Sequence, residues 1–407
     1  MRTECKKARR ISPWLLLYLV QLLVCSNKCN SFILEGNETE PGTEIESMCP
    51  CEDCKCNLAE KIPTPEGSPK TLVSAGKRTV TSSGGSAPML IDGKYCDSTP
   101  WQPGKALPAW VAIEVGGGIC ELLLYWVASE NSNYDLPSQP NLQHGAPVSY
   151  NIETSADSTN GSDGTWTIVK HINNNTLTAR SHSIHFCNQR WLRFVVLDDS
   201  YTYSGVQIHE IELHDNSDRR INGWLFFGDS ITVNAFNRKE SQNPAFSTLI
   251  WEANSGYYPM QINGGHNGDS ALVAINRLIQ ALDENDGINV VAICLGTNDA
   301  STLSRDRELY RNAMRAMVIE VQKRDKIAII PRVPWSTYTY LTSRDKLAMA
   351  QIVDDLRKEF KLPAGPDLFT FFKNNPHLLL DAVHPNEEGN REINRLWAEA
   401  ALLIPEF

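Results

Sequence analysis

Three residues in the C-terminal half of the chain have the types that nucleophilic catalysis requires. Ser230 comes directly after the segment "WLFFGD", and Asp381 and His384 stand three positions apart in "DAVHPN". A serine nucleophile needs a base that takes its proton and an acid that orients and stabilises this base. We therefore predict that Ser230 attacks an acyl carbon, with His384 as the general base and Asp381 as the acid.

Two further polar positions follow apolar runs and carry hydrogen-bond donors. Gly268 lies in "NGGHNGDS" and Asn298 lies in "GTND". A developing oxyanion is stabilised by donors that already point at its position before the reaction begins. We predict that the backbone N–H groups of Ser230 and Gly268 and the side-chain amide of Asn298 form an oxyanion hole. A helix that begins at Ser230 would add its positive N-terminal end.

Other polar residues nearby are expected to have structural roles. A second Gly-Asp-Ser occurs further along the chain, and we expect its Asp269 or Ser270 to cap a helix that starts near Ala271. We expect Asp229 to accept hydrogen bonds from loop backbone and not to serve the histidine. Neither expectation changes the assignment of the nucleophile.

Aromatic residues in one loop are candidates for substrate binding. The loop "PWSTYTY" follows the apolar run "KIAII" and contains Trp335, Tyr338 and Tyr340. These side chains could stack on a sugar or close the hydrophobic core, since aromatic rings serve both purposes. The sequence leaves both alternatives open.

The elements that must position these residues show a change of pattern after residue 222. The apolar runs "WLFFG", "INVVAICLG" and "KIAIIPRVP" are separated by stretches with apolar residues three and four positions apart. Short buried strands that alternate with amphipathic helices indicate a parallel sheet covered on both faces. Ligands of such sheets bind at the carboxyl ends of the strands, where Ser230, Gly268 and Asn298 occur. The prediction for residues 222–407 is an α/β three-layer sandwich.

The polar blocks of this region occur in an order that a known enzyme family shares. "GDSIT", the glycine of "NGGHNGDS", "GTND" and "DAVHP" resemble the four sequence blocks of the SGNH (GDSL-type) serine hydrolases, from about Trp224 to the C-terminus. The resemblance implies a flavodoxin-like fold and the roles given above for Ser230, Gly268, Asn298 and His384. This family does not use the G-x-S-x-G elbow of other serine hydrolases. Many relatives carry a glycine soon after the first block, where this chain has "VNAF". The resemblance therefore does not predict the shape of the acyl pocket.

Residues 77–217 have a different pattern. Short alternating runs such as "WVAIEVG", "VSYNIETSAD" and "RWLRFVVLD" are separated by stretches rich in Gly, Asn, Asp and Ser, which is typical of an antiparallel β-sandwich. The segments "DGKYCDSTPWQPGKALPAWVAIEVG" and "VQIHEIELHD" are similar to the discoidin branch of galactose-binding-like jelly rolls. This resemblance implies a ligand such as a glycan, bound by loops at one end of the sandwich.

The sandwich contains several candidate ligand-binding residues. These are Tyr95, Trp101 and the tyrosines within 201–203, with burial in the core as the alternative for Trp101. The resemblance does not decide whether the sandwich binds a structural calcium ion. One disulfide is expected among the cysteines of this region, Cys96, Cys120 and Cys187.

The first 26 residues have the pattern of a secretion signal. Four basic residues within positions 6–10 precede the apolar run "ISPWLLLYLVQLLV". An uncleaved anchor and a lipid-modified Cys25 are the alternatives, which would attach the protein to a membrane through its N-terminus. All three place the rest of the chain outside the cytoplasm.

Residues 27–76 are predicted to be a disordered Cys- and Pro-rich linker, whose cluster from Cys49 to Cys56 fits a disulfide knot or a metal site.

The charge of the chain bears on its partners. The 407 residues carry a formal net charge of −10 without a basic stripe, which argues against a nucleic-acid ligand.

We predict an extracytoplasmic serine esterase, independent of metals and cofactors, that removes acyl groups and in particular acetyl from carbohydrate, with the sandwich holding the glycan. The alternatives are a lipase or thioesterase for longer acyl chains and a non-catalytic glycan-binding protein of the cell surface.

Overall fold

The computed structural model describes most of the chain from residue 71 to residue 404, together with isolated residues between 62 and 69. The described ranges are 71–95, 99–104, 106–128, 145–199, 205–217, 222–238, 244–299, 306–337 and 343–404. All of them belong to one unit of the chain, Cys54–Phe407. Several sequence-based predictions fall outside the described residues: the signal or anchor of residues 1–26, most of the linker, the cluster from Cys49 to Cys56, Cys96, the tyrosines within 201–203, Tyr338 and Tyr340.

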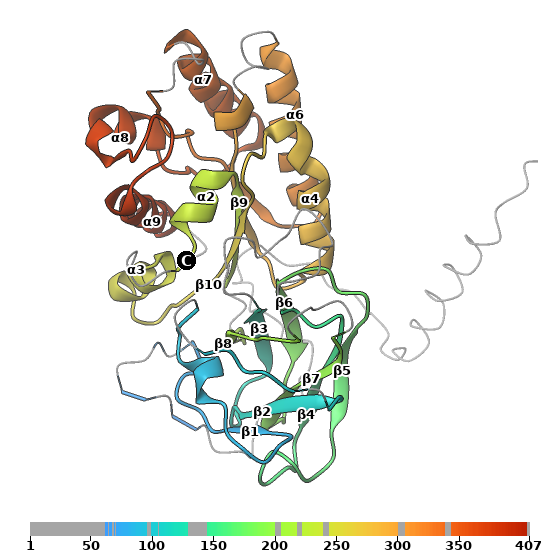
Figure 1. The fold of residues 1–407 in the computed structure, drawn as a ribbon. Coiled ribbons are helices and arrows are strands. Elements are labelled where there is room, and N and C mark those ends of the chain that lie inside the picture. Colours follow the sequence, from blue (N-terminus) through green and yellow to red (C-terminus); the bar gives the residue numbers. More distant parts are fainter. Residues whose placement is uncertain are drawn as a thin grey trace, which may run out of the picture. The chain divides into compact units, whose positions relative to one another are not determined.

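A parallel sheet forms the centre of the C-terminal part (Figure 1). Within the described residues its strand order is β10-β9-β11-β12. The strands are β9 (Gly223–Gly228), β10 (Met260–Gly265), β11 (Val290–Cys294) and β12 (Ile327–Ile329). Every residue of β9, β10 and β11 is buried. Such strands are apolar nearly throughout because layers of helices cover both faces of the sheet.

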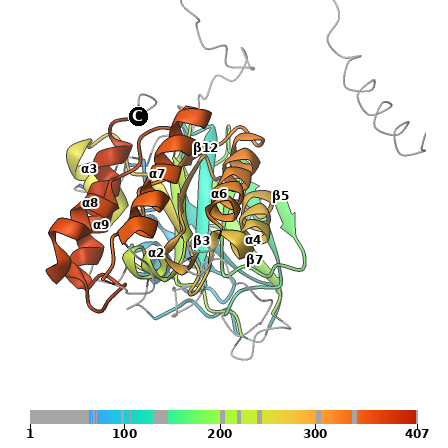
Figure 2. The same cartoon turned by 90° about the horizontal axis from the view of Figure 1, so that it is seen from above.

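Helices pack on both faces of this sheet, as Figures 1 and 2 show. One face carries α4 (Ala271–Glu284), α6 (Arg307–Gln322) and α7 (Ser343–Phe360), and the other carries α2 (Ser230–Ala235), α3 (Phe246–Ala253), α8 (Leu368–Asn374) and α9 (Glu387–Ala401). On β9, Leu225 and Phe227 join the first hydrophobic core, whereas Trp224 and Phe226 join the second. The predicted parallel α/β architecture is therefore confirmed. No helix in the described ranges is long and apolar enough to cross a membrane.

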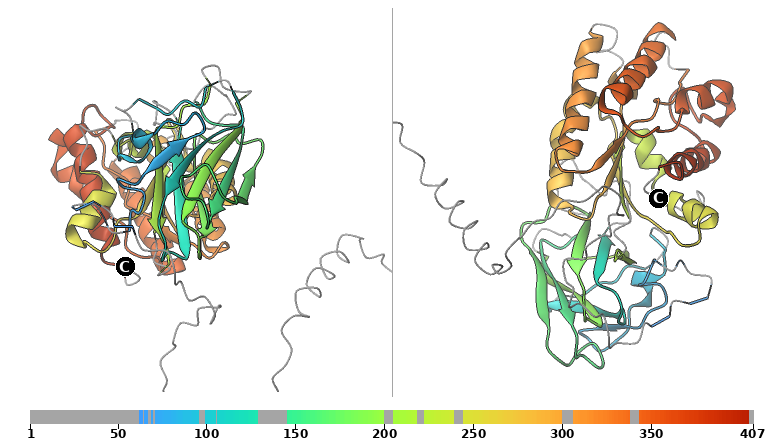
Figure 3. Two further views of the ribbon diagram at one scale, coloured as in Figure 1. Left: turned by 90° about the horizontal axis from the view of Figure 1, so that it is seen from below. Right: turned by 180° about the vertical axis from the view of Figure 1, so that it is seen from behind.

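Two antiparallel sheets make up the described chain between residues 79 and 215 (Figure 3). The first has the order β1-β2-β7-β4-β5 and the second has the order β6-β3-β8. Their strands are β1 (Thr79–Thr81), β2 (Ala109–Glu114), β3 (Glu121–Val127), β4 (Ser149–Ser155), β5 (Thr167–Ile172), β6 (Ala179–His185), β7 (Trp191–Asp198) and β8 (Glu210–Asp215). Trp126 of β3 and Phe194 of β7 pack in one shared core. The antiparallel architecture is confirmed, and the jelly-roll and discoidin-like assignments stay predictions.

One disulfide ties the end of the β3 and β6 pair. It joins Cys120, which precedes β3, to Cys187, which follows β6. The sequence predicted a disulfide in this region and left its partners open, because the register of two strands cannot be read from cysteine spacing. The antiparallel pairing of Glu121 with His185 brings the two cysteines together.

The second antiparallel sheet is buried against the C-terminal part. Leu123 and Tyr125 of β3 belong to the same hydrophobic core as Leu278 of α4 and Ile288 before β11. A Cβ atom on Gly287 would lie 2.2 Å from Leu123 Cδ1, so the chain needs a residue without a side chain at this contact. The interface is therefore packed as closely as a protein interior.

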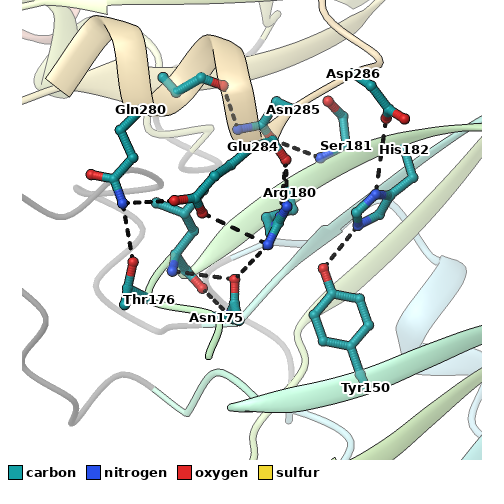
Figure 4. A network of polar contacts seen from close by, with 12 residues as sticks. Tyr150, Asn175, Thr176, Arg180, Ser181, His182, Gln280, Glu284, Asn285 and Asp286 are labelled. Atoms are coloured by element: carbon teal, nitrogen blue, oxygen red, sulfur yellow. Dashed lines mark hydrogen bonds and ion pairs between the residues drawn. The ribbon is translucent and has the colours of Figure 1, made fainter. Parts of the chain in front are cut away.

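Polar contacts complete this interface at β6 (Figure 4). The backbone N–H of Ser181 donates to Asn285 Oδ1 at 2.9 Å, and Arg180 Nη2 donates to the carbonyl oxygen of Glu284 at 2.6 Å. β6 is an edge strand, and an edge strand presents backbone groups that need partners. Asn285, directly after α4, supplies the partner for the backbone N–H of Ser181, and the carbonyl of Glu284 at the end of α4 accepts from the Arg180 side chain.

A buried ion pair joins the two parts at a second place. Arg238, which follows α2, donates from Nη1 to Glu212 Oε1 of β8 at 3.2 Å. Its guanidinium group stacks on the ring of Tyr95 at 4.0 Å, and the hydroxyl of Tyr95 donates to the same carboxylate. Burial lowers the pKa of Arg238 to about 10, which leaves it charged at neutral pH. Tyr95 is thus an interface residue and not an exposed ligand-binding residue.

Replacing Arg238 by alanine is expected to lower the free energy of unfolding by about 3–5 kcal/mol, because Glu212 would stay buried without its cation. Arg395, a partly buried residue that pairs with Glu392 and Glu399 at the surface of α9, is the control, since surface ion pairs contribute only about 0–1 kcal/mol. Thermal and urea unfolding of Arg238→Ala and Arg395→Ala compare the two. Equal losses of stability in the two variants would contradict the structural role given to Arg238.

Candidate active site

Ser230, His384 and Asp381 form a continuous chain of hydrogen bonds. Ser230 is the first residue of α2, directly after β9. Its Oγ lies 2.9 Å from His384 Nε2, and His384 Nδ1 lies 2.9 Å from Asp381 Oδ2. A carboxylate accepts only, so the Nδ1–H donates to Asp381 and Nε2 is left to accept the serine proton. The structure thus brings together the three residues that the sequence predicted as nucleophile, base and acid.

The loop around Asp381 holds the carboxylate in place. Asp381 Oδ1 accepts from the backbone N–H groups of Val383 and His384, each at 2.7 Å. These donors, first among them the backbone N–H of His384, lower the pKa of Asp381 to about 2. Asp381 is therefore ionised throughout the neutral range. The loop closes on itself, because the N–H of Leu380 donates to the carbonyl oxygen of His384 at 2.8 Å.

Asp229 has a separate role at the start of α2. It is the N-cap residue, and its Oδ1 accepts from the backbone N–H of Ile231 at 3.0 Å. This contact confirms the expectation that Asp229 bonds to backbone. Burial raises the pKa of Asp229 to about 7, and the nearby carboxylate of Asp299 acts in the same direction. The cap fixes the first turn of the helix whose first residue is Ser230.

Gly268 and Asn298 line the same cleft as Ser230. Gly268 follows β10 and has a φ of +80°, a left-handed conformation that favours glycine. Asn298 lies in the short 3₁₀ helix Thr297–Asp299 after β11, and its Nδ2 donates to the carbonyl oxygen of Asp269 at 2.9 Å. An amide nitrogen carries two N–H groups, so one is left for an oxyanion. The role of these residues as an oxyanion hole stays a prediction.

The cap of α4 differs from the expectation. The side chain of Ser270, the N-cap residue, makes no capping hydrogen bond. The backbone N–H of Ala271 instead donates to the two carboxylate oxygens of Asp299 at 3.0 and 3.2 Å. Asp269 is already engaged by Arg277, whose Nη2 lies 2.6 Å from its Oδ2. The predicted cap by Asp269 or Ser270 is wrong, because the carboxylate of Asp299, which follows β11, accepts from the N-terminal N–H group of α4 instead.

The cleft at Ser230 has a volume of about 920 Å³ and is lined by thirteen described residues. Its apolar lining residues are Leu380 and Pro385, and its acidic ones are Asp381 and Glu387. None of the described lining residues is Lys or Arg. The largest group is formed by asparagines: Asn234, Asn237, Asn267, Asn298, Asn386 and Asn390. The cleft therefore offers amide donors and acceptors around the nucleophile.

Trp101 and Trp335, two of the aromatic residues predicted to bind substrate, lie away from the cleft at Ser230. Trp101 is 8% exposed and belongs to the core of the antiparallel sheets, where its backbone pairs with Ile208. Burial, the alternative for Trp101, is what the structure shows, since a large indole ring stabilises a core. Trp335 is partly buried against the core beneath α2 and α9, with Lys346 Nζ 5.2 Å from its ring. Neither tryptophan is among the residues that line the cleft at Ser230.

The sequence-based prediction missed the asparagines on α2 and α9. Asn386, Asn390 and Asn394 are spaced by four residues and so share one face of α9. Asn386 caps this helix, since its Oδ1 accepts from the N–H of Gly389 at 2.9 Å. This spacing, directly after the predicted base His384, is a signal in the sequence that could have pointed to the wall of the cleft.

Within the described ranges, no three residues of the types His, Cys, Asp and Glu are grouped so that they could hold a metal ion. His266, near the cleft, has Nδ1 2.9 Å from Asp269 Oδ1 and is engaged in that pair. The Cys49 to Cys56 cluster lies outside the described residues.

Residues 226–392 match the model of the GDSL-like Lipase/Acylhydrolase family. This part of the chain is therefore a GDSL-type (SGNH) hydrolase domain, and it contains Ser230, Gly268, Asn298, Asp381 and His384. The matched residues begin in β9 and end in α9, so the two antiparallel sheets lie outside the match. No curated protein sequence matches the chain significantly.

Solved structures are similar to less than half of the chain. The acetyl xylan esterase AlAXEase is 22% identical, with a TM-score of 0.37, and the match covers 45% of this chain and 100% of that chain. The lipase/acylhydrolase from Enterococcus faecalis is 21% identical, with a TM-score of 0.38 and coverage of 45% and 98%. An acetylxylan esterase from Geobacillus stearothermophilus is 19% identical, with a TM-score of 0.36 and coverage of 44% and 95%.

Proposed function

We propose that the GDSL-type hydrolase domain is a serine esterase that removes acetyl groups from carbohydrate through an acyl-enzyme on Ser230. The hydrogen-bonded chain from Ser230 through His384 to Asp381 carries this proposal. Its two distances of 2.9 Å lie within the hydrogen-bond range in which a base can take the proton of a nucleophile.

The first half of the reaction forms the acyl-enzyme. Ser230 Oγ attacks the ester carbonyl carbon while its proton passes to His384 Nε2. The oxyanion of the tetrahedral intermediate accepts hydrogen bonds from the backbone N–H groups of Ser230 and Gly268 and from the amide of Asn298. When the intermediate collapses, His384 returns the proton to the departing alkoxide, which leaves as a sugar hydroxyl. The acyl group is then an ester of Ser230.

The second half regenerates the enzyme. A water molecule attacks the acyl carbon and gives its proton to His384. The same donors stabilise the second oxyanion, and the bond to Ser230 Oγ breaks with return of the proton from His384. Acetate leaves, and the ionised Asp381 stabilises the imidazolium that forms in each half.

The asparagines that line the cleft favour a polar substrate with a short acyl group. Asparagine amides match the hydroxyl groups of a sugar, because both donate and accept. A lipase for long acyl chains would need a continuous apolar groove, and the described lining residues offer Leu380 and Pro385. A thioesterase for coenzyme A esters would need cations for the phosphates, and none of the described lining residues is Lys or Arg.

We further propose that the protein acts outside the cytoplasm, with the antiparallel sheets as a discoidin-like accessory domain. The pattern of the first 26 residues and the disulfide between Cys120 and Cys187 support this location, since disulfides persist in oxidising compartments. A glycan bound by the accessory domain would contact residues other than Tyr95 and Trp101, which are buried. A non-catalytic glycan-binding protein is the second candidate, and the complete hydrogen-bonded chain at Ser230 speaks against it.

A series of 4-nitrophenyl esters tests the function. With chelator present, we expect hydrolysis of the acetate, with kcat/KM falling steadily from acetate through butyrate to octanoate. A maximum at octanoate would replace the proposal with a lipase. No hydrolysis of any ester by folded protein would leave only the non-catalytic candidate.

A further inference from the structure

Asn390 of α9 is a buried amide in the wall of the cleft that contains Ser230. It is 4% exposed, and its Oδ1 accepts no hydrogen bond from the part of the chain that the structure describes. Buried side-chain oxygens normally have a donor, because they have lost their hydrogen bonds to water. Asn390 also lines the cleft, so its amide group lies beside the space that a ligand would fill.

The position of Asn390 follows from its neighbours on α9. Asn386 at the N-cap and Asn394 one turn beyond Asn390 lie on the same face of the helix. Asn394 Nδ2 donates to the carbonyl oxygen of Ala235, the last residue of α2, at 2.7 Å. This face of α9 is therefore turned toward α2. Asn390 stands between that contact and the end of α9 that follows His384.

α2 and the residues just after it contribute two further amides to the lining of the cleft. Asn234 and Asn237 both line the cleft, and Asn234 lies four residues, or about 6 Å along the helix, from Ser230. Asn234 is half-buried, and its side chain makes no hydrogen bond within the described ranges. Asn234, Asn237 and Asn390 thus line the same cleft as the nucleophile.

The charge of the cleft narrows the class of ligand. Asp381 and Glu387 are the charged acids of its lining, and the described lining contains no Lys or Arg. A carboxylate or phosphate on the ligand would meet negative charge without a partner. Amides, in contrast, can donate to and accept from the hydroxyl groups of an uncharged ligand.

We propose that Asn390, Asn234 and Asn237 form an acceptor subsite, which binds the hydroxyl groups of an uncharged sugar while its ester carbonyl lies at Ser230. The subsite rests on the proposed esterase function and adds the class of alcohol that the enzyme releases. When the sugar binds, the Asn390 side chain turns its buried Oδ1 toward the cleft and accepts from one sugar hydroxyl, and a second hydroxyl bonds to Asn234.

The test compares two acetyl esters that use the same chemistry. Mono-O-acetyl methyl glucoside presents sugar hydroxyls to the subsite, whereas 4-nitrophenyl acetate presents none. In Asn390→Leu, which keeps the size of the side chain without its hydrogen bonds, we expect kcat/KM for the glucoside ester to fall about 10-fold and kcat/KM for 4-nitrophenyl acetate to change less than about 2-fold. The wild type is expected to prefer the glucoside ester over the corresponding glucuronide ester.

A second variant covers the case in which Asn390→Leu fails to fold. Asn234→Ala changes a half-buried residue at the end of a helix, and we expect it to lower kcat/KM selectively for the glucoside ester by about 3-fold or more. The exposed Asn173, on the antiparallel sheets, gives the matched control Asn173→Ala. Equal losses on both esters, no loss on the glucoside ester, or a preference for the glucuronide would overturn the subsite and leave the esterase in place. A wild type inactive on both esters would overturn the proposed function itself.

Discussion

Ser230→Ala is expected to lower kcat/KM for 4-nitrophenyl acetate by roughly 10⁴-fold or more, since removal of a serine nucleophile leaves only binding and oxyanion stabilisation. The Oγ atom is the one that takes the acyl group and the one that donates to His384 Nε2. The alanine side chain is smaller and fits the first turn of α2 without strain. The thermal unfolding temperature is therefore expected to stay close to that of the wild type, and steady-state kinetics measure the loss.

The second Gly-Asp-Ser supplies a matched control. Ser270 stands at the N-cap of α4, its side chain makes no capping hydrogen bond, and it does not line the cleft. Ser270→Ala is accordingly expected to keep its activity within about 2-fold. Retained activity in Ser230→Ala, or a comparable loss in Ser270→Ala, would remove Ser230 from the role of nucleophile.

The parallel sheet and its catalytic edge were predictable because the signal is local. The run from Trp224 to Gly228 is apolar without alternation, which is the mark of a strand buried on both faces. The carboxyl ends of parallel strands lie along one edge, so the polar blocks that begin at Ser230, Gly268 and Asn298 had to meet there. The local pattern and the topology together therefore predict that the cleft lies at the carboxyl ends of the strands.

Other contacts depend on relations between distant segments that no pattern encodes. Asp299 caps α4 because the loops that follow β10 and β11 lie close together. The position of Asp269 in the sequence, next to the helix, predicted Asp269 as the cap, but its carboxylate binds Arg277. The burial of Tyr95 depends on how β8 approaches Arg238. The sequence pattern indicated Tyr95 and Trp101 as aromatic loop residues. Such a pattern does not distinguish an exposed ring from one that is buried in an interface or a core.

Asp381→Asn is expected to lower kcat/KM for 4-nitrophenyl acetate by roughly 10²–10⁴-fold, although the new side chain has nearly the same shape. The amide oxygen of asparagine can still accept from the N–H groups of Val383 and His384, so the loop is kept. The amide nitrogen would then face His384 Nδ1 and donate to it. This exchange puts the imidazole proton on Nε2, which can no longer accept the proton of Ser230.

Kinetics at pH 8 separate this tautomer effect from a loss of folding. Because the pKa of Asp381 is about 2, the wild-type carboxylate is fully ionised at this pH and its charge would be lost only as the pH falls through about 2. Asp367 is an exposed capping carboxylate on α8 that accepts from the N–H of Thr370 at 2.9 Å, and Asp367→Asn is the control for the same chemical change. If Asp381→Asn and Asp367→Asn are equally active, Asp381 is only a loop residue. If Asp381→Asn alone is inactive and unfolds at the wild-type temperature, the carboxylate acts through the orientation and protonation of His384.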